Sequence, residues 1–260
     1  MTSAHLFSIE GMAALASTMS RGPLLAFDFD GTLAPIVARP DDARVPLAVA
    51  RRLDRLAQRL PIAIISGRRV DDIRERLSFA PQFVIGNHGA EDPLAGSNFG
   101  PERLDPVRGQ LRAQAAELES AGVTIEDKGY SLALHYRLSR ERERARLVVE
   151  ALVAGLGQEA SAYGGKMVMN IVAAGADDKA DAVAGLVRRC GVEAAVFLGD
   201  DVNDEPVFAR AEPSWLTVKV GRDDPASKAS FAIDATEVAR LLDAMLDAVA
   251  RADAAVGDRR

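Results

Sequence analysis

Short apolar runs alternate with amphipathic helical patterns along much of the chain. The apolar runs cover residues 23–29, 61–66, 83–87, 194–200 and 214–220, and each has the length of a buried strand. Strands that alternate with helices are typical of a parallel sheet covered by helices. The pattern therefore predicts an α/β core.

Helical periodicity fills the intervals between these strands. Between the first two strands, apolar side chains recur on one helical face at Leu47, Ala50, Leu53, Ala57 and Leu60. Arginines lie on the opposite face. Pro46 suits the first turn of this helix. A second helix is expected to begin at Lys179, and a closing helix is expected over residues 236–249.

The middle of the chain follows a different order of elements. Its patterns predict helix, strand, strand, helix and strand over residues 104–120, 123–127, 131–138, 140–156 and 166–172. The tripeptide "DKG" at 127–129 is typical of a hairpin turn between antiparallel strands. Two helices on an antiparallel sheet can form a small domain of roughly 70 residues. We therefore expect an inserted domain over residues 99–173, between the core segments 1–98 and 174–260.

The composition of the 260-residue chain is that of an ordinary globular protein, with 48% hydrophobic and 27% charged residues. The net charge of −6 argues against a nucleic-acid partner but leaves a phosphorylated substrate open. The single cysteine, Cys190, excludes an internal disulfide and a cysteine-based zinc site. No stretch has the pattern of a signal peptide or a membrane span, so we expect a cytoplasmic protein with no membrane partner. No strongly apolar exposed helix face stands out, and we expect a monomer.

Two aspartates follow the first apolar run directly. Asp28 and Asp30 flank one phenylalanine, and Gly31 and Thr32 come next. Carboxylates at positions i and i+2 of an extended chain point to the same side, where their mutual repulsion is costly. A cation or phosphate chemistry between the two carboxylates would remove that cost. The pair favours a binding site at the end of the first strand.

Polar chemistry also stands at the ends of other elements. Ser66 and Arg68 follow the second strand, Lys179 starts a helix, and an acidic cluster at 199–205 follows a later strand. Ligands of open α/β sheets gather beyond the carboxyl ends of the strands. Carboxylates, a hydroxyl group and an ammonium group at one such edge are suited to moving a phosphoryl group on Mg²⁺.

Each of these motifs also has a purely structural interpretation. Asp30 and Thr32 can be turn residues after a strand, and Ser66 can cap a helix. Lys179 alone would be an exposed helix lysine, and residues 199–205 could form a solvated acidic turn. The occurrence of all four motifs, with the acidic run directly after a buried strand, favours the functional interpretation.

The four motifs "DFDGT", "SGR", Lys179 and "GDDVND" resemble, in order and spacing, the signature motifs of the haloacid-dehalogenase-like (HAD) phosphatases. The inserted unit stands where that superfamily carries its type-two cap domain. The resemblance implies a Rossmann-like parallel-sheet core with an inserted α/β cap.

Further stretches narrow the resemblance. "GNHGAE", "EDKGYSLALHYR", "GGKMV" and "GDDVNDE" are similar to the bacterial trehalose-6-phosphate phosphatases, over roughly residues 24–235. This resemblance implies a phosphoric monoester hydrolase of trehalose biosynthesis, which converts trehalose 6-phosphate into trehalose and phosphate with Mg²⁺ as cofactor. The implied partner is a small-molecule sugar phosphate.

The family mechanism assigns a role to each core residue. Asp28 would attack phosphorus and become an aspartyl phosphate, and Asp30 would serve as general acid and then as general base. The remaining catalytic residues implied are Thr32, Ser66, which would hold phosphoryl oxygens, and Lys179, which would offset the paired carboxylates. The implied Mg²⁺ ligands and their supporting groups are Asp28, the backbone carbonyl of Asp30, Asp200, Asp201 and Asp204.

The resemblance also implies residues that contact the substrate. They are Arg68, His88, Gly89, Glu91, Glu126, Lys128, His135, Arg137, Lys166 and Asn170. His135 and His88 can also be structural, one packed under helices and the other capping backbone groups. Asn170 stands where the family has a glutamate, and an asparagine accepts hydrogen bonds from sugar hydroxyls more weakly.

The change at Asn170 leaves two further hypotheses open. The first is a phosphatase of the same build that acts on another sugar phosphate. The second is a non-catalytic sensor of sugar phosphates, against which the retained Asp28, Asp30, Lys179 and Asp200 argue, because a sensor needs no nucleophile.

Overall fold

The chain forms two compact units in a computed structural model that describes residues 4–94, 100–165, 167–221 and 224–257. The core unit joins Met1–Gly89 to Asp178–Arg260, and the inserted unit is Ala90–Asp177. The predicted fold class, a parallel-sheet α/β core with an inserted α/β unit, is confirmed.

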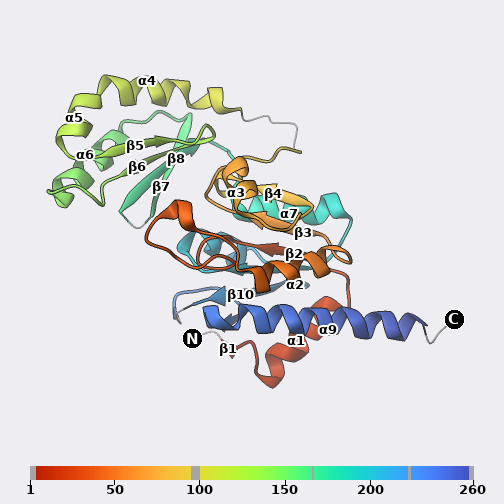
Figure 1. Ribbon diagram of the computed structural model, residues 1–260. Helices are drawn as coiled ribbons and strands as arrows, with labels where there is room; N and C mark the ends of the chain where they lie inside the picture. Colours follow the sequence, from red (N-terminus) through yellow and green to blue (C-terminus); the bar gives the residue numbers. More distant parts are fainter. Residues whose placement is uncertain (1–3, 95–99, 166, 222–223, 258–260) are drawn as a thin grey trace. The chain divides into compact units, whose positions relative to one another are not determined.

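Seven strands of the described residues form the parallel sheet of the core unit (Figure 1). In spatial order they are β1 (Ala4–His5), β11 (Phe231–Ile233), β10 (Leu216–Val220), β9 (Ala195–Gly199), β2 (Leu24–Phe27), β3 (Ile62–Ile65) and β4 (Phe83–Ile85). Every residue of β2, β3 and β9 is buried, which explains their unbroken apolar runs. Strands β1 and β11 were not predicted, because two and three residues are too short for a recognisable pattern.

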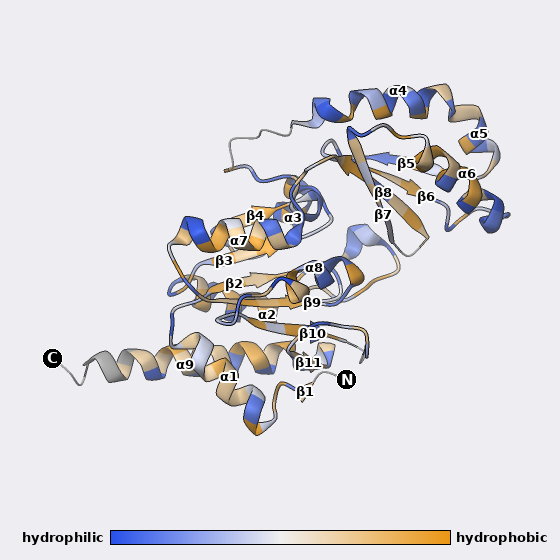
Figure 2. Cartoon of the chain, turned by 180° about the vertical axis from the view of Figure 1, so that it is seen from behind, coloured by the Kyte–Doolittle hydropathy of each residue, from blue (hydrophilic) through white to orange (hydrophobic). Residues whose placement is uncertain are grey.

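Helices cover both faces of the core sheet. Leu25 and Phe27 of β2 pack in one apolar layer with α1 (Ile9–Met19), α2 (Leu47–Ala57), α3 (Val70–Arg76) and α9 (Val238–Gly257). Leu24 and Ala26 face the other layer, which contains α7 (Lys179–Cys190) and α8 (Glu205–Ala209). The helix α9 runs beside α1 and α2. Figure 2 shows the hydrophobic colours concentrated on the central strands between these layers.

The predicted apolar face of α2 is confirmed except at its first position. Ala50 and Leu53 are buried and Ala57 and Leu60 pack against the core, but Leu47 is 59% exposed, and Val49 and Leu56 are buried in addition. The helix begins only at Leu47, directly after Pro46, so the core-facing positions start two residues later. The expectation that Leu47 faces inward was therefore wrong.

Four strands among the described residues form the antiparallel sheet of the inserted unit. Their spatial order is β5 (Thr124–Asp127), β6 (Ser131–His135), β8 (Val168–Ala173) and β7 (Ala160–Gly165). The hairpin expected at 127–129 joins β5 to β6. The expected helix 104–120 is divided at Gln114 into α4 (Asp105–Ala113) and α5 (Ala115–Ser120), and α6 (Arg142–Ala154) lies within the expected 140–156. Strand β7 was missed because its two glycines break the apolar alternation.

The two faces of the inserted sheet differ in character. Leu132, Leu134 and Ile171 belong to the apolar cluster under α4, α5 and α6. Neighbouring positions along a strand point to opposite faces, so Glu126, His135 and Asn170 lie on the face without helices. The register places Glu126, Ala133, Asn170 and Tyr163 in one row across the four strands. We call the face that carries this row, opposite the helices, the open face of the inserted sheet.

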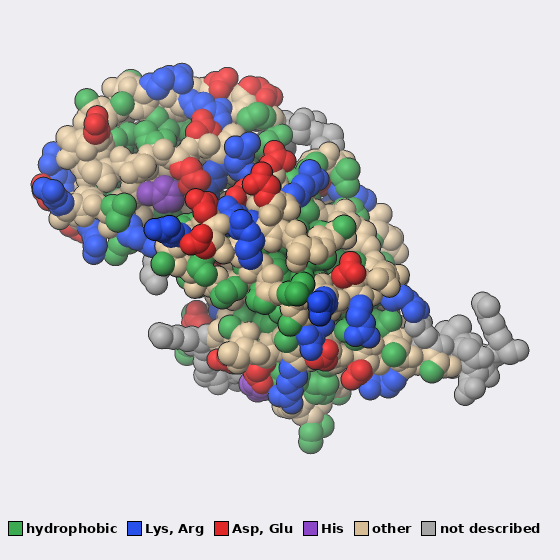
Figure 3. Space-filling model, in the orientation of Figure 1, with side chains coloured by type: hydrophobic (Ala, Val, Ile, Leu, Met, Phe, Trp, Pro, Cys, Tyr) green, Lys and Arg blue, Asp and Glu red, His purple; other side chains and the backbone are tan. Residues whose placement is uncertain are grey.

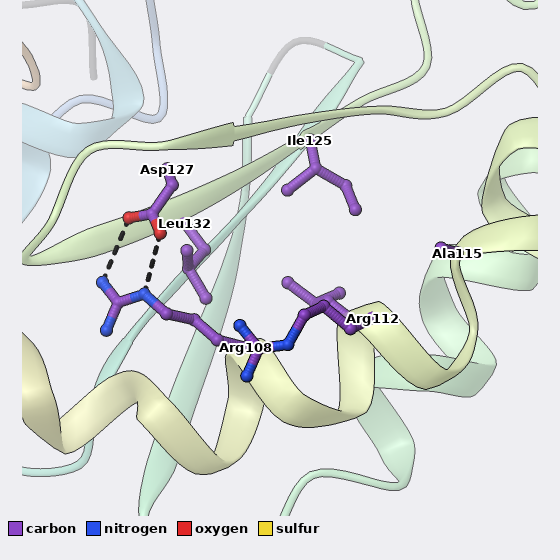
Figure 4. A pocket seen from close by; sticks show the side chains of 7 residues that line it. Arg108, Arg112, Ala115, Ile125, Asp127 and Leu132 are labelled. Atoms are coloured by element: carbon purple, nitrogen blue, oxygen red, sulfur yellow. Dashed lines mark hydrogen bonds and ion pairs between the residues drawn. The ribbon is translucent and has the colours of Figure 1, made fainter.

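A pocket opens on the helix side of the same sheet, between α4 and strands β5 and β6 (Figure 4). Its walls are mainly apolar, with Leu111, Ile125 and Leu132 among them. Arg108 closes one side by donating to both oxygens of Asp127, at 2.7 and 3.0 Å. The ion pair ties α4 to β5, so the pocket belongs to the packing of the inserted unit and lies away from its open face.

The described residues contain no helix with the length and apolar character needed to cross a bilayer. On the face drawn in Figure 3, acidic and basic side chains are interspersed and neither sign forms a continuous field.

Candidate active site

The carboxyl ends of β2 and β9 bring two aspartates to one edge of the core sheet. The strands pair with Phe27 opposite Leu198, and the Asp28 N–H donates to the Leu198 carbonyl at 2.9 Å. Asp28 and Asp200 are the first residues after these strands. Carboxylate oxygens of Asp28, Asp200 and Asp204 lie within 4.8 Å of one another. We call these three residues the carboxylate cluster, and a metal ion could bind there.

Lys179 supplies an ammonium group to the carboxylate cluster. Its Nζ donates to Oδ1 of Asp28 at 2.7 Å and to Oδ1 of Asp204 at 2.6 Å, and the lysine is only 3% exposed. Lys179 is the first residue of α7, where the Asp178 carboxylate accepts the N–H of Asp181 and the Asp181 carboxylate accepts the N–H of Asp178. This capping box determines where the helix begins and so places the lysine at the cluster.

Burial and mutual repulsion shift the titration of these groups. Burial raises the pKa of Asp28 well above 3.8, Lys179 opposes the rise, and Asp204 and Asp200 add to it. Burial, followed by Asp204 and Asp201, raises the pKa of Asp200 to about 6. Burial lowers the pKa of Lys179, but the carboxylates of Asp204 and Asp28 outweigh it and raise that pKa above 10.5. Lys179 offsets part of the negative charge of the three carboxylates, and a divalent cation would neutralise the remaining charge.

The backbone beside the cluster leaves room only for glycine. A Cβ at Gly31, whose φ is +81°, would lie 2.0 Å from Oδ2 of Asp200, and one at Gly199 would lie 2.3 Å from Cγ of Asp204. The buried Oγ1 of Thr32 has no hydrogen-bond partner among the described residues. Hard oxygen donors around a buried, negatively charged site fit Mg²⁺, and the unsatisfied hydroxyl fits a further polar ligand.

Asp30 does not share the lysine with Asp28. The carbonyl of Phe29 accepts N–H bonds from Leu33 and Ala34, so the chain turns directly after Asp28 and leaves the extended conformation. Asp30 lies on this turn, half-exposed, and both of its oxygens accept from Arg68, at 2.7 and 2.8 Å. The expectation that Mg²⁺ and Lys179 together neutralise Asp28 and Asp30 is thus incomplete, because Arg68 forms an ion pair with Asp30.

The other residues expected at this edge also lie in the core unit. Ser66 follows β3, is 1% exposed, and its Oγ accepts the N–H of Arg68 at 3.2 Å. The ring of His88 lies so close to Gly67 that a Cβ there would be 2.3 Å from Nε2. Gly89 is buried with a φ of +118°. Ser66 does not cap the following helix, because the N-cap of α3 is Arg69 and no described side chain caps that helix start. Ser66 lies at the edge of the core sheet where phosphoryl oxygens were expected.

Asp201 plays a different part from the three members of the cluster. Its side chain accepts the N–H of Asp204, while the Asp201 N–H donates to Oδ2 of Asp204 at 3.0 Å. Asp201 itself is exposed. The residue holds Asp204 in place and, within the described part of the chain, adds no oxygen to the cluster.

The open face of the inserted sheet gathers several of the residues expected to contact substrate. Nε2 of His135 lies 2.9 Å from Oε2 of Glu126, and Nζ of Lys128 lies 3.9 Å from the same oxygen. Asn170 stands two strands from Glu126 in the same row and is 6% exposed. Arg137 is exposed just beyond the end of β6.

Glu91 lies at the start of the inserted unit, outside its sheet, and Lys166 lies outside the described residues.

Sequence reasoning missed Lys219. This lysine is the second-last residue of the apolar strand β10, where it stands opposite Gly199. It is 6% exposed, and its Nζ lies 3.9 Å from Oε1 of Glu205. Its charge lowers the pKa of Asp200 and so opposes the effect of burial. A lone lysine inside the run "LTVKV" was the available signal, because a buried charge needs a partner.

The sequence of the chain is similar to a known protein family and to individual members of it. The family model described as trehalose-phosphatase matches residues 26–236. The chain is 33% identical over 237 residues to a probable trehalose-phosphate phosphatase of Sinorhizobium fredii, covering 88% of this chain and 89% of that protein. It is 28% identical over 259 residues to the trehalose-phosphate phosphatase of Mycobacterium tuberculosis, and spans only 65% of the length of that relative.

Solved structures give a consistent result. A crystal structure of a trehalose-6-phosphate phosphatase related protein superposes with a TM-score of 0.69 at 26% identity, covering 86% of this chain and 98% of that one. The C-terminal domain of trehalose-6-phosphate phosphatase from C. albicans gives a TM-score of 0.71 at 20% identity, covering 94% and 97%, and supports the fold alone.

Proposed function

The chain belongs to the trehalose-phosphatase family, and from that premise we propose that it hydrolyses trehalose 6-phosphate to trehalose and phosphate. The observation that carries the proposal is the buried Asp28 carboxylate, held by Lys179 at the strand edge where the carboxylate cluster converges. A nucleophile with a fixed orientation beside a cation site is what phosphoryl transfer requires.

The chemistry proceeds in two displacements. Asp28 Oδ attacks phosphorus, the bond from phosphorus to the sugar oxygen breaks, and that oxygen takes a proton from Asp30. Water then attacks the phosphorus of the aspartyl phosphate and gives a proton to Asp30. The bond between phosphorus and the Asp28 oxygen breaks, so that phosphate is released and the Asp28 carboxylate is restored. Thr32 and Ser66 hold phosphoryl oxygens, and Lys179 balances the negative charge around Asp28.

Mg²⁺ is the cofactor we assign to this site. Asp28, Asp200 and the carbonyl of Asp30 would hold it, with Asp201 and Asp204 in support. The ion would supply positive charge against the phosphoryl oxygens and the buried carboxylates. The support comes from the excess of carboxylates over ammonium groups and from the glycines that keep the cluster open.

We assign substrate recognition to the inserted unit, which serves as the cap expected at 99–173. The residues proposed to contact the sugar are Glu91, Glu126, Lys128, His135, Arg137, Lys166 and Asn170, and those proposed nearer the phosphate are His88 and Gly89. The support is the polar open face, where Glu126, Lys128 and His135 lie together. Closure of a cap over a core is a common way to exclude water from a phosphoryl-transfer site.

A second substrate is favoured by one observation. Asn170 is a neutral amide in the same row as Glu126, where the family resemblance leads one to expect a carboxylate. Such a change alters which hydroxyl groups the open face can bind, so a phosphatase of the same build could prefer another sugar phosphate.

Phosphate release from a panel of esters tests the proposal. The panel contains trehalose 6-phosphate, glucose 6-phosphate, sucrose 6-phosphate and p-nitrophenyl phosphate, each with Mg²⁺ and with EDTA, and Asp28→Asn is the blank. A Mg²⁺-dependent preference for trehalose 6-phosphate supports the proposal. Preference for another sugar would support the second substrate, and no release from any ester by folded protein would leave a sugar-phosphate sensor.

A further inference from the structure

The guanidinium group of Arg68 holds both oxygens of Asp30. Nε of Arg68 donates to Oδ2 at 2.7 Å and Nη2 donates to Oδ1 at 2.8 Å. A two-point contact between a planar guanidinium and a carboxylate sets the direction of the carboxylate as well as its position. The orientation of Asp30 therefore depends on Arg68.

Arg68 is itself held from several sides. Nη1 donates to Oδ2 of Asp72 at 2.9 Å, Nη2 donates to the Pro40 carbonyl at 2.9 Å, and the guanidinium lies 5.6 Å from the centre of the Phe29 ring. Four hydrogen bonds to described acceptors occupy the group, which has five N–H donors in all. Turning the Arg68 guanidinium toward a ligand would break these hydrogen bonds.

The partner of Arg68 is anchored in turn. Asp72 lies on α3 and accepts from Arg76, a buried arginine one turn further along the helix. Arg76 also donates to the carbonyl of Asp41 at 2.6 Å. Partial burial raises the pKa of Asp72, but the hydrogen bonds from Arg76 and Arg68 together outweigh it, so that the pKa is lowered. The series from Arg76 through Asp72 and Arg68 to Asp30 joins α3 to the turn after β2.

Asp30 remains accessible within this arrangement. Its side chain is 42% exposed, and each carboxylate oxygen has two lone pairs, of which Arg68 uses one. A leaving oxygen or a water molecule can still reach the other lone pairs. Arg68 thus directs the carboxylate without covering it.

We propose that Arg68, supported by Asp72, is a positioning residue for Asp30 and does not bind the sugar phosphate, which revises the contact expected from the sequence. This inference rests on the proposed function, in which Asp30 protonates the leaving oxygen. A misdirected Asp30 slows the departure of a sugar alkoxide, which needs that proton. It slows the departure of p-nitrophenolate much less, because that anion is stable without one.

The ratio kcat/KM isolates the first displacement, because it covers the steps up to formation of the aspartyl phosphate. For Arg68→Met we expect kcat/KM to fall on the order of 10²–10³-fold with trehalose 6-phosphate, the size of a general-acid contribution. The fall with p-nitrophenyl phosphate is expected to be at least tenfold smaller. Asp30→Asn gives the reference pattern, and adding Arg68→Met to it is expected to cost little more, because both act through one group.

Two further variants keep the test informative if Arg68→Met unfolds. Arg68→Lys keeps the charge but loses the two-point contact, and Asp72→Asn weakens the support of Arg68 without touching Asp30. Both are expected to show the same dependence on the leaving group, with melting curves and circular dichroism confirming folded protein.

Other patterns overturn the proposal. Equal losses with both esters, or a higher KM at unchanged kcat, would make Arg68 a substrate ligand. Fully additive losses in the double variant would separate Arg68 from Asp30. If the wild-type protein releases phosphate from neither ester, the proposed function fails first and this inference fails with it.

Discussion

The ammonium of Lys179 donates to the buried carboxylate of Asp28 across 2.7 Å, although 151 residues separate the two in the chain. The same ammonium bonds Asp204, so one cation at a helix start connects the ends of β2 and the β9 loop. The contact lies at the centre of the candidate active site.

Replacing Lys179 by methionine should abolish most activity. The change leaves Asp28 and Asp204 buried without their ammonium, and breaking such a pair costs about 3–5 kcal/mol. We expect phosphate release to fall on the order of 10²-fold or more, and the free energy of unfolding to fall measurably in urea. Lys228→Met is the matched control, because Lys228 is exposed and far less should change. Full activity in Lys179→Met would show that the ammonium is dispensable.

A methyl group at Gly199 should disturb the carboxylate cluster. The added Cβ would lie 2.3 Å from Cγ of Asp204, which Lys179 and the Asp201 N–H already hold in place. We expect Gly199→Ala to weaken the effect of Mg²⁺ on the melting temperature and to cost about 1–3 kcal/mol of stability.

Gly109→Ala provides the control for Gly199→Ala. Gly109 lies inside α4, and apart from its chain neighbours and the backbone of its own helix no described atom lies within 4 Å of its Cβ position. Alanine there should therefore stabilise the helix by about 0.5–1 kcal/mol. If Gly199→Ala behaved like Gly109→Ala, the cluster would be less rigid than its contacts indicate.

The binding of Mg²⁺ should weaken in acid. Burial, with the charges of Asp204 and Asp201, raises the pKa of Asp200 to about 6, so below pH 6 a metal ion must displace a proton. We expect the dissociation constant of Mg²⁺ to rise by up to about tenfold per pH unit between pH 6 and pH 5, measured by calorimetry. EDTA should abolish phosphate release at every pH.

Asp200→Asn serves as the control for this pH dependence. The variant should bind Mg²⁺ weakly, and the pH dependence should be smaller, because one of the two carboxyl groups with a raised pKa, Asp28 and Asp200, is gone. A dissociation constant of the wild type that stays flat from pH 5 to pH 7.5 would contradict the prediction.

Asp178 should contribute stability that is lost only in strong acid. Burial raises the pKa of this carboxyl, but the N–H of Asp181 and the guanidinium of Arg210 outweigh it and hold the pKa below 3.8. A folded-state pKa below the unfolded one means that the contribution is complete above about pH 4 and disappears as the pH falls through the folded value. Urea unfolding of Asp178→Asn should therefore differ from the wild type at pH 7 and approach it near pH 2.

The size of the Asp178 effect separates charge from capping. The ion pair between Asp178 and Arg210 is half-exposed, so solvent screening keeps its contribution to the free energy of unfolding below about 1 kcal/mol. Asp178→Ala also removes the cap of α7 and should cost about 1 kcal/mol more. Equal stability of Asp178→Asn and the wild type throughout the pH range would show that the charge contributes nothing.

Local sequence patterns predict five of the seven described strands of the core sheet and the polar residues that follow three of them. The runs around Leu25, Ile64 and Phe197 are buried on both faces, so their apolar character is continuous and local. Carboxyl ends of parallel strands share an edge, which is why Asp28, Ser66 and Asp200 could be expected near one another before any coordinates. The helix start at Lys179 was equally local, since Asp178 and Asp181 form its capping box.

The pairing of the charges depends on the three-dimensional fold. Asp28 and Asp30 are two residues apart, yet one bonds Lys179 and the other bonds Arg68, because the chain turns at Phe29 instead of continuing as a strand. The buried Lys219 lies opposite Gly199 only because β10 is the neighbour of β9. Such contacts join residues far apart in the chain, and they depend on strand order and on turns that no local apolar pattern records.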